Sequence, residues 1–276
     1  MRLALTGVCR SESPWLAEWI AYHRLLGFDH IHLGCNDPKD SDEYVRSKAV
    51  AQPYIDMGVL SWHDWPDKPG RRTSGAAKRQ HEYYDFIIHN NKKRHDWMAV
   101  LDVDEYLVSS HPDLKELIET LYVPMENLAG VCCKWRLFGS GGLETVQGEL
   151  QTEKLVYHIP AEVPVAKHSK SIFRLDRVGP IANPHEPKPK AGFRLISAGD
   201  GMTPEKWKPL CVNHYFCRGP QDFKRKIAFG RFQGMRQMTE PERWRMWNIY
   251  NDAATAVDTS MAAWADRIRE AIANPR

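Results

Sequence analysis

The chain has 276 residues, enough for one large domain or for one domain with an appendage. Its 42% hydrophobic and 26% charged residues are typical of a globular protein. The net charge of +3 argues against a general nucleic-acid binder, and no apolar run approaches the roughly 18 residues of a membrane-spanning helix. We therefore expect no nucleic-acid partner and no transmembrane segment.

The six cysteines show neither a CxxC pair nor the Cys/His spacing of a zinc site. Cys132 and Cys133 are adjacent within an apolar segment and cannot easily bridge each other. We interpret all six as reduced, small hydrophobic side chains. Together with an N-terminus that lacks a signal-peptide pattern, they predict a reducing, cytoplasmic setting.

The first 107 residues predict alternating strands and helices. Strands are expected over 3–9, 28–34, 59–63 and 97–103, and helices over 15–26, 45–54 and 76–90. This alternation favours a mainly parallel sheet with helices on both faces. Ligands bind such sheets beyond the carboxyl ends of the strands, where several polar residues of this chain are expected.

The second half predicts short elements of mixed type. A helix is expected over 114–121, strands over 130–138, 154–159, 169–175, 192–196 and 210–216, and a basic helix over 223–229. The glycine cluster at 139–142 predicts a mobile or tightly turned loop, and prolines on both sides of His185 predict a rigid turn. Apolar residues at helical spacing from Pro241 to Ile272 predict a long helix that packs onto the body of the protein or onto a partner.

One stretch joins an apolar run of strand length, residues 97–101, to the acids Asp102, Asp104 and Glu105. Close like charges repel unless a cation lies between them. Because residues i and i+2 of a strand face the same way, Asp102 and Asp104 can point at one object. A divalent cation is the natural candidate, since Mg²⁺ and Mn²⁺ take carboxylate oxygens together with substrate phosphates. The alternative is a strand end whose acids cap the next turn or helix.

These motifs resemble the glycosyltransferase family 2-like and family 92-like enzymes, which share the GT-A fold. The matching residues, which cover nearly the whole chain, are Glu12 with 15–23, 27–31, 36–37, Gln80, 101–107, Trp135 with 138–140, 170–172, 185–187, 214–215 with Phe223 and Lys226, 251–252 and 258–260. Two positions depart from the family. Ser11 stands where the family usually has Asn, and Gly219-Pro220 where it commonly has Ser after the basic residue that follows His-Tyr.

The resemblance implies an α/β, GT-A (Rossmann-like) fold with a mixed, mainly parallel sheet flanked by helices. The GT-A domain is expected over 1–235, with a nucleotide-sugar-binding half over 1–107 and an acceptor half over 108–235. Residues 236–276 are expected to form a C-terminal helical extension, where a peripheral membrane or homo-oligomer contact could form.

The implied activity is inverting transfer of a sugar from a nucleotide-sugar, more often a UDP-sugar than a GDP-sugar, to an acceptor hydroxyl with Mn²⁺ or Mg²⁺. A metal held by Asp102 and Asp104 would stabilise the charge of the leaving diphosphate. A glycan (as in polysaccharide biosynthesis), a lipid-linked glycan and a protein are all open as acceptors. One alternative function is that of a metal-dependent nucleotidyltransferase, but such enzymes have a Gly-rich basic signature near the N-terminus that residues 9–12 lack. The other alternative is an inactive carbohydrate-binding or scaffold protein.

Side chains from both halves are candidates for the donor site. The expected donor-binding residues are Arg10, Glu12, Asn36, Asp37, Arg79, Gln80, Asp102, Val103, Lys170, His214, Lys226 and Arg231. As third metal ligand beside Asp102 and Asp104, His185 is favoured over His214 because the flanking prolines would hold it rigidly.

The acceptor side is expected around the glycine cluster. Inversion needs a general base for the acceptor hydroxyl. Glu144 is the first choice as the carboxylate nearest this loop, and Glu105 and Glu149 are further candidates. The expected acceptor-binding residues are Trp135, Phe138, Gly139 and Ser140. The two aromatic rings either stack on a sugar or pack in the core.

Overall fold

The computed structural model describes residues 1–65, 76–163, 168–181, 185–198, 209–228 and 238–275. Its helices are α1 (Ser13–Leu26), α2 (Asp42–Asp56), α3 (Ala76–Asn91), α4 (Leu114–Leu121), α5 (Gln151–Lys154), α6 (Pro220–Ala228), α7 (Glu240–Ala253) and α8 (Ala265–Ala273). Its strands are β1 (Leu3–Cys9), β2 (His30–Cys35), β3 (Leu60–Asp64), β4 (Trp97–Val100), β5 (Glu105–Ser109), β6 (Leu128–Leu137), β7 (Tyr157–His158), β8 (Ser169–Arg174), β9 (Val178–Ile181), β10 (Pro187–Pro189), β11 (Arg194–Ser197), β12 (Leu210–His214) and β13 (Ala256–Val257).

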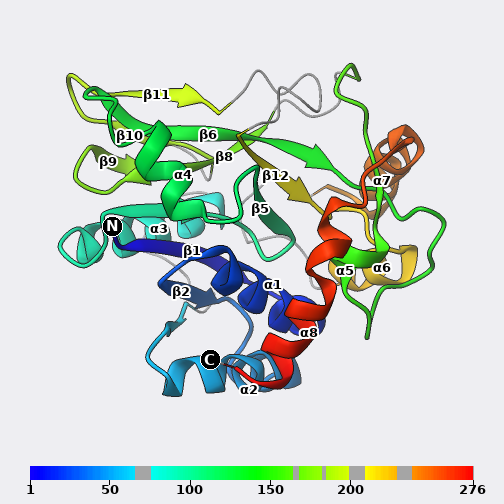
Figure 1. Cartoon of the computed structure of the whole chain (residues 1–276). Coiled ribbons are helices and arrows are strands. Elements are labelled where there is room, and N and C mark those ends of the chain that lie inside the picture. Colours follow the sequence, from blue (N-terminus) through cyan, green and yellow to red (C-terminus); the bar gives the residue numbers. More distant parts are fainter. Residues whose placement is uncertain (66–75, 164–167, 182–184, 199–208, 229–237, 276) are drawn as a thin grey trace.

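Nine of the described strands form the main sheet, in the order β3-β2-β1-β4-β8-β6-β12-β5 with β11 beside β6 (Figure 1). Five of its pairings are parallel and three are antiparallel. Because β8 is antiparallel to both β4 and β6, those two strands run in the same direction as β1, β2, β3, β11 and β12. The predicted mixed, mainly parallel sheet flanked by helices is confirmed.

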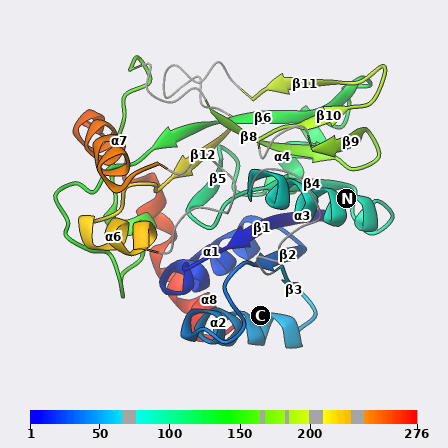
Figure 2. The same ribbon diagram turned by 180° about the vertical axis from the view of Figure 1, so that it is seen from behind.

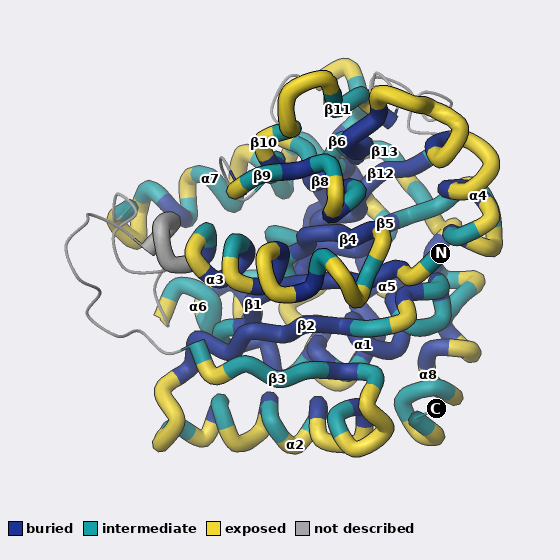
Figure 3. The backbone as a smooth tube through the Cα atoms, turned by 90° about the vertical axis from the view of Figure 1, so that its left-hand side faces the viewer, coloured by how far each residue is buried: buried dark blue, intermediate teal, exposed yellow. Residues whose placement is uncertain are grey.

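Apolar side chains form one core on each face of the sheet. Along β1, Leu3 and Leu5 belong to the core under α1, α4 and α8, whereas Ala4 and Val8 belong to the core under α3. Figure 1 shows α4 in front of the sheet, and Figure 2, from behind, shows α3 in front. Strands covered on both faces have continuous apolar sequences, and β4 is buried along its whole length (Figure 3).

The central strand is shorter than predicted. It ends at Val100, and Asp102 to Asp104 lie in a turn that leads into β5. The Glu105 N–H donates to the Asp102 carbonyl at 2.9 Å, and the Asp102 N–H donates to Glu105 Oε2 at 2.8 Å. This turn redirects the chain, so that β5 pairs with β12 instead of extending β4. The prediction that strand alternation orients the two aspartates was therefore wrong, and a turn fixes them instead.

The single long helix predicted over 241–272 is also wrong, because the structure contains α7 and α8. Between them lie β13, which pairs with β7, and a 3-10 helix over Ser260–Trp264. Asp258, in this connection, pairs with the buried Arg136 of β6 and so anchors the break. Both helices keep apolar residues at helical spacing, which is why the sequence suggests one element.

The last helix packs on the body of the protein. Ile268 is fully buried in the main core, and the Trp264 ring lies 5.2 Å from the Tyr22 ring of α1. Figure 1 shows α8, in red, beside α1. The sequence predicted that this region packs either onto the body of the protein or onto a partner, and α8 packs onto the body.

The cysteines lie mostly in the interior, as small hydrophobic side chains do. All six cysteines carry free thiols, and five of the side chains are buried while Cys132 is half-buried. None of the helices within the described residues is both long enough and apolar enough to cross a membrane.

Four histidines pack together where β2 and β3 meet the segment before β4. His32 Nε2 lies 3.1 Å from His95 Nε2, and the His32 ring is 4.6 Å from His30 and 5.8 Å from His63. Burial, followed by the neighbouring histidines, lowers the pKa of His32 to about 2. Burial likewise lowers the pKa of His95 to about 4. The cluster is therefore neutral in the folded protein near pH 7.

Acidification should destabilise the protein through this cluster. Unfolded histidine has a pKa of about 6.5, so below that pH the unfolded chain binds more protons than the folded chain. The stability that the neutral histidines contribute is complete above about pH 6.5 and is lost as the pH falls toward 4. Urea unfolding midpoints should fall more steeply between pH 7 and 5 in the natural protein than in His32→Asn. His89→Asn, at an exposed position of α3, serves as control. Equal slopes in all three proteins would contradict this.

Candidate functional site

Polar side chains gather at the edge of the sheet where β1, β2, β4, β6 and β12 end. These strands run in one direction, so their carboxyl ends lie at the same edge, as Figure 1 shows for β1, β6 and β12. The strands β5 and β8 run in the opposite direction and begin at this edge. They bring Glu105 and Lys170 to the acidic turn after β4.

Asp102 is held by a buried lysine and a glutamine. Lys170 Nζ lies 2.8 Å from Asp102 Oδ2 and 3.2 Å from Glu105 Oε2. Gln80 Nε2 donates to Asp102 Oδ1 at 2.9 Å. The side chain of Asp102 is 34% exposed, whereas Lys170 is 1% and Glu105 0% exposed. Asp102 is therefore the member of this group that a ligand can reach.

The charges of this group depend on one another. Burial raises the pKa of Glu105 well above its usual range, against the opposing effect of Lys170. Burial alone would lower the pKa of Lys170, but Asp102 and Glu105 outweigh it and raise that pKa above its ordinary value. Lys170 therefore stays a cation between two acids. Because Glu105 is fully buried, it is placed to orient the turn and not to meet an acceptor directly.

Asp104 belongs to a second group. Its carboxylate pairs with Lys226 of α6 and lies 3.4 Å from His214 Nε2. Burial alone would raise the pKa of Asp104, but Lys226 and His214 hold it well below its usual range. The two aspartates of the Asp-x-Asp motif are therefore neutralised by different lysines.

His185 has the chemistry of a metal ligand. Its Nδ1 lies 2.9 Å from the Ser169 carbonyl, which can only accept, so Nδ1 carries the proton and Nε2 holds the lone pair. Burial lowers the pKa of His185 to about 4, which keeps the ring neutral near pH 7. The partly exposed Asp102 carboxylate suits Mg²⁺ or Mn²⁺, and a neutral imidazole is a common metal ligand in proteins.

A complete metal cage is absent from the described part of the chain, where no three His, Cys, Asp or Glu side chains form a metal-binding group. Mg²⁺ and Mn²⁺ sites in enzymes that act on phosphates often have only one or two carboxylates and complete their coordination with substrate phosphates. The residues present fit such a site, and they do not fit a cage built by protein alone.

The predicted donor residues at the ends of β1 and β2 contact one another. An Arg10 guanidinium nitrogen donates to Asn36 Oδ1 at 2.9 Å, and the Ser11 N–H lies 3.1 Å from both carboxylate oxygens of Asp37. Ser11 has a φ of 59°, in the left-handed region that Asn tolerates better than Ser. This strained position gives a physical reason for the Asn that the family usually has there. Among the described residues, the buried Ser11 Oγ has no hydrogen-bond partner.

On the acceptor side, Phe138 is 2% exposed and its ring lies 4.8 Å from Tyr215. Of the two predicted roles for this ring, core packing is the one that the structure shows. Trp135 is half-buried, with its ring 4.3 Å from His214. The Ser140 N–H donates to Asn251 Oδ1 at 2.8 Å, so α7 holds the loop that follows β6. Glu144 lies further along this loop and is exposed.

Three predicted donor residues are placed differently from the rest. Val103 is 2% exposed and its side chain packs in the main core, so it is not placed to contact a donor. Arg231 lies outside the described residues, as does the side chain of Arg79, whose backbone belongs to α3.

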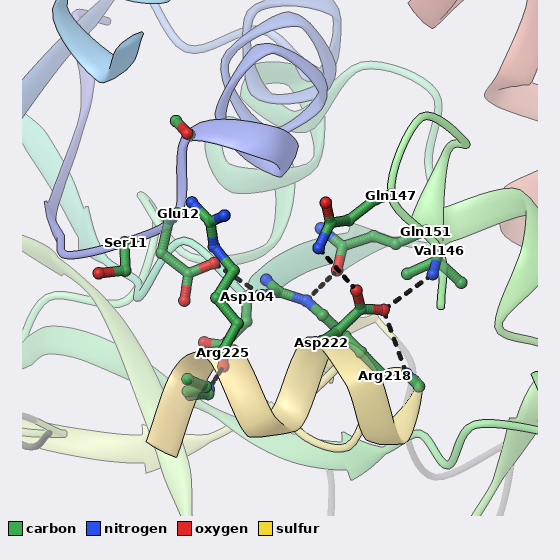
Figure 4. Close-up of polar contacts among 12 residues, drawn as sticks. Ser11, Glu12, Asp104, Val146, Gln147, Gln151, Arg218, Asp222 and Arg225 are labelled. Carbon is green, nitrogen blue, oxygen red and sulfur yellow. Dashed lines mark hydrogen bonds and ion pairs between the residues drawn. The ribbon is translucent and has the colours of Figure 1, made fainter. Parts of the chain in front are cut away.

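Arg218 is a site residue that the sequence analysis missed. Its guanidinium lies 3.6 Å from the centre of the Trp15 ring, pairs with Glu12 at 2.8 Å and donates from Nε to Gln151 Oε1 at 2.9 Å. Figure 4 shows Arg218 between Glu12 and Gln151. Its only signal in the sequence was its place just after the matched His214-Tyr215 block.

A second missed residue, Asp222, holds the loop after Glu144 through both of its carboxylate oxygens. No motif in the sequence marked it.

The chain is similar to one family of glycosyltransferases over most of its length. The model of glycosyltransferase family 92 matches residues 6–187. A glycosyltransferase family 92 protein of Ricinus communis is 20% identical over 237 residues, which are 82% of this chain and 37% of that protein. One from Oryza sativa subsp. japonica is 22% identical over 222 residues, which are 79% of this chain and 34% of that protein. The chain thus spans about a third of the length of these relatives.

The chain is also similar to solved structures at low sequence identity. A mannosyltransferase from Pyrobaculum calidifontis, in complex with GDP-Man and Mn²⁺, has a TM-score of 0.43 and 14% identity, covering 100% of this chain and 76% of its own. Glucosyl-3-phosphoglycerate synthase from Mycobacterium tuberculosis has a TM-score of 0.33 and 13% identity, covering 64% of this chain and 58% of its own.

Removing the shared lysine should destabilise the fold strongly. Lys170→Met leaves Glu105 buried without a counter-ion, and breaking a buried pair in this way costs about 3–5 kcal/mol. The double variant Lys170→Met/Glu105→Gln should lose less than the single one, because no buried charge remains unpaired. Lys154→Met, which breaks an exposed pair with Glu149, should cost less than about 1 kcal/mol. Urea unfolding measures all three. A double variant less stable than the single one would contradict the prediction.

Proposed function

This chain belongs to glycosyltransferase family 92, and we propose that it transfers a sugar from a nucleotide-sugar donor to an acceptor hydroxyl. The observation that supports this most is the Asp102 carboxylate. It is 34% exposed, is held by Lys170 and Gln80, and lies where open α/β sheets bind ligands. The Lys226 cation, 32% exposed beside the acidic turn, suits the phosphates of such a donor.

The donor in this proposal is a UDP-sugar, bound along the ends of β1, β2 and β4. Arg10, Glu12, Asn36 and Asp37 would meet the nucleoside, because their side chains follow β1 and β2 at this edge. The diphosphate would lie toward the partly exposed Asp102 and Lys226. The buried Ser11 Oγ, which lacks a hydrogen-bond partner among the described residues, is available to such a ligand.

We propose that Mn²⁺ or Mg²⁺ is held by Asp102 and His185 Nε2, with diphosphate oxygens completing its coordination. When bound, the cation would stabilise the negative charge that develops on the leaving diphosphate. Asp104 is the further predicted ligand. Because Lys226 already neutralises it, a cation would compete with this lysine for the Asp104 carboxylate.

In the reaction, the acceptor oxygen forms a bond to the anomeric carbon while the bond from that carbon to the phosphate oxygen breaks. The electron pair of the broken bond leaves on the nucleoside diphosphate, and the hydroxyl proton passes to a carboxylate base. We propose Glu144 as this base, with Glu149 second, since both are exposed on the loop after β6. Attack from the side opposite the leaving group inverts the anomeric centre.

A glycan, a lipid-linked glycan or a protein would suit this chemistry as acceptor, with polysaccharide biosynthesis as one setting. A reducing, cytoplasmic compartment is part of the proposal because all six cysteines carry free thiols.

Nucleotide binding should appear as thermal stabilisation. A ligand at about 100 times its Kd adds about 2.7 kcal/mol to the native state, which raises the melting temperature measurably. We expect UDP and one UDP-sugar to raise it with Mn²⁺ and to raise it less with EDTA. GDP should act more weakly. No shift with any of a panel of nucleotides and nucleotide-sugars, with or without metal, would contradict the proposal and favour a carbohydrate-binding or scaffold role.

Replacement of the exposed aspartate should remove turnover while sparing the fold. Asp102→Asn keeps the size of the side chain but removes the charge, so release of nucleoside diphosphate should fall by about 100-fold or more. Asp96→Asn makes the same change just before β4, where Asp96 pairs with Arg2, and should leave turnover nearly unchanged. Similar rates in Asp102→Asn and the natural protein would rule out this role for Asp102.

A further inference from the structure

Resting on the proposed function, we infer that Asp222 is a positioning residue that fixes the acceptor-side loop, residues 144–147, against α6. The same helix carries Lys226, the partner of Asp104. Asp222 would thus set the place of the loop relative to the acidic turn.

Asp222 binds the acceptor-side loop through both carboxylate oxygens. Its side chain is 1% exposed. Oδ1 accepts from Thr145 Oγ1 at 2.7 Å and from Gln147 Nε2 at 3.3 Å, and Oδ2 accepts from the Val146 N–H at 2.8 Å and the Gly219 N–H at 3.3 Å. Figure 4 shows Asp222 on α6 with contacts to Val146 and Gln147. Hydrogen bonds to a carboxylate are about twice as strong as those between neutral groups.

The backbone of the loop lies directly against the start of α6. A Cβ added to Gly219 would lie 2.2 Å from the Glu144 carbonyl oxygen and 2.5 Å from the Thr145 nitrogen, which no side chain can tolerate. The Gln221 N–H donates to that same carbonyl at 3.1 Å. This contact gives a physical reason for the Gly219-Pro220 of this chain, at the place after the basic residue where the family commonly has Ser.

The other end of α6 reaches the acidic turn. Residues i and i+4 of a helix lie on the same face, and Lys226 follows Asp222 by four positions. Lys226 pairs with Asp104, and its neighbour Arg225 pairs with Glu43 of α2. One short helix therefore joins the acceptor-side loop to the Asp-x-Asp motif and to the nucleotide half. A misplacement of about 1 Å between reacting groups can cost about 100-fold in rate.

The short helix α5, residues 151–154, follows the acceptor-side loop and is held by other residues. Glu18 accepts from the backbone N–H of Gln151 at 2.9 Å and from Thr152, and Arg218 donates to the Gln151 side chain. Loss of Asp222 should therefore loosen residues 144–147 and leave 151–154 in place. A general loss of stability would loosen both.

Hydrogen–deuterium exchange of the free protein tests the contact itself. Asp222→Asn should speed exchange at the amides of 145–147 while 151–154 stay as in the natural protein. Thr145→Val, at an exposed position, removes the donor to Asp222 Oδ1 and also the hydroxyl that accepts from the Gln147 N–H. Its effect is therefore read at the Val146 amide, where we expect a smaller change of the same kind even if Asp222→Asn folds poorly. Asp266→Asn, fully exposed on α8, is the matched control and should change neither segment. Unchanged exchange at 145–147 in both loop variants would overturn the inference.

Turnover tests the positioning role. The probes are the UDP-sugar that stabilises the natural protein most, water as one acceptor, and a panel of p-nitrophenyl glycosides as the others. Asp222→Asn should lower transfer to a glycoside about 10-fold to 100-fold, while hydrolysis of the donor and the thermal shift with UDP and Mn²⁺ stay within about twofold. Equal losses of transfer and hydrolysis, or no loss of transfer, would overturn the positioning role.

If the natural protein neither binds nor turns over any nucleotide-sugar, the proposed function fails and the positioning role fails with it. The exchange experiment still decides whether Asp222 holds residues 144–147.

Discussion

The cation of Lys170 is the interaction on which the candidate site depends. It lies between Asp102 and Glu105, and without it a fully buried acid would face a second acid across a tight turn. Lys170 is the second residue of β8, the strand that lies between β4 and β6 and runs antiparallel to both. The same strand that joins the two halves of the sheet therefore also supplies the charge that makes the acidic turn stable.

A second connection crosses the site through the segment from His214 to Lys226. Arg218 contacts Glu12, which follows β1, and Asp222 contacts the loop over 144–147. Lys226, at the end of this segment, pairs with Asp104. Two lysines, one from β8 and one from α6, thus neutralise the two aspartates separately. A divalent cation at this place would act within a site whose charges are already balanced by protein groups.

Much of the site could be predicted because its residues follow buried strands. The apolar sequences of β1, β2 and β4 identify those strands, and strands of one direction bring Glu12, Asn36 and Asp102 to one edge. The turn at Asp102 to Glu105 could not be predicted in the same way. Its direction depends on pairing of β5 with β12, whose residues lie about a hundred positions later in the chain. For the same reason the role of Phe138 stayed open, and the prediction of one helix over 241–272 missed the break between α7 and α8, since both depend on tertiary contacts.

By itself, the sequence determined the order of the first strands and helices, the mainly parallel sheet and the place of Asp102 at its carboxyl edge. These follow from local periodicity, which each segment carries within itself. The tertiary structure alone decided which cation neutralises which acid, because Lys170 and Lys226 lie 68 and 122 positions after Asp102 and Asp104. It also decided that Glu105 is buried while Asp102 is exposed. Ion pairs between distant residues depend on which strands and helices become neighbours, and no local pattern records that choice.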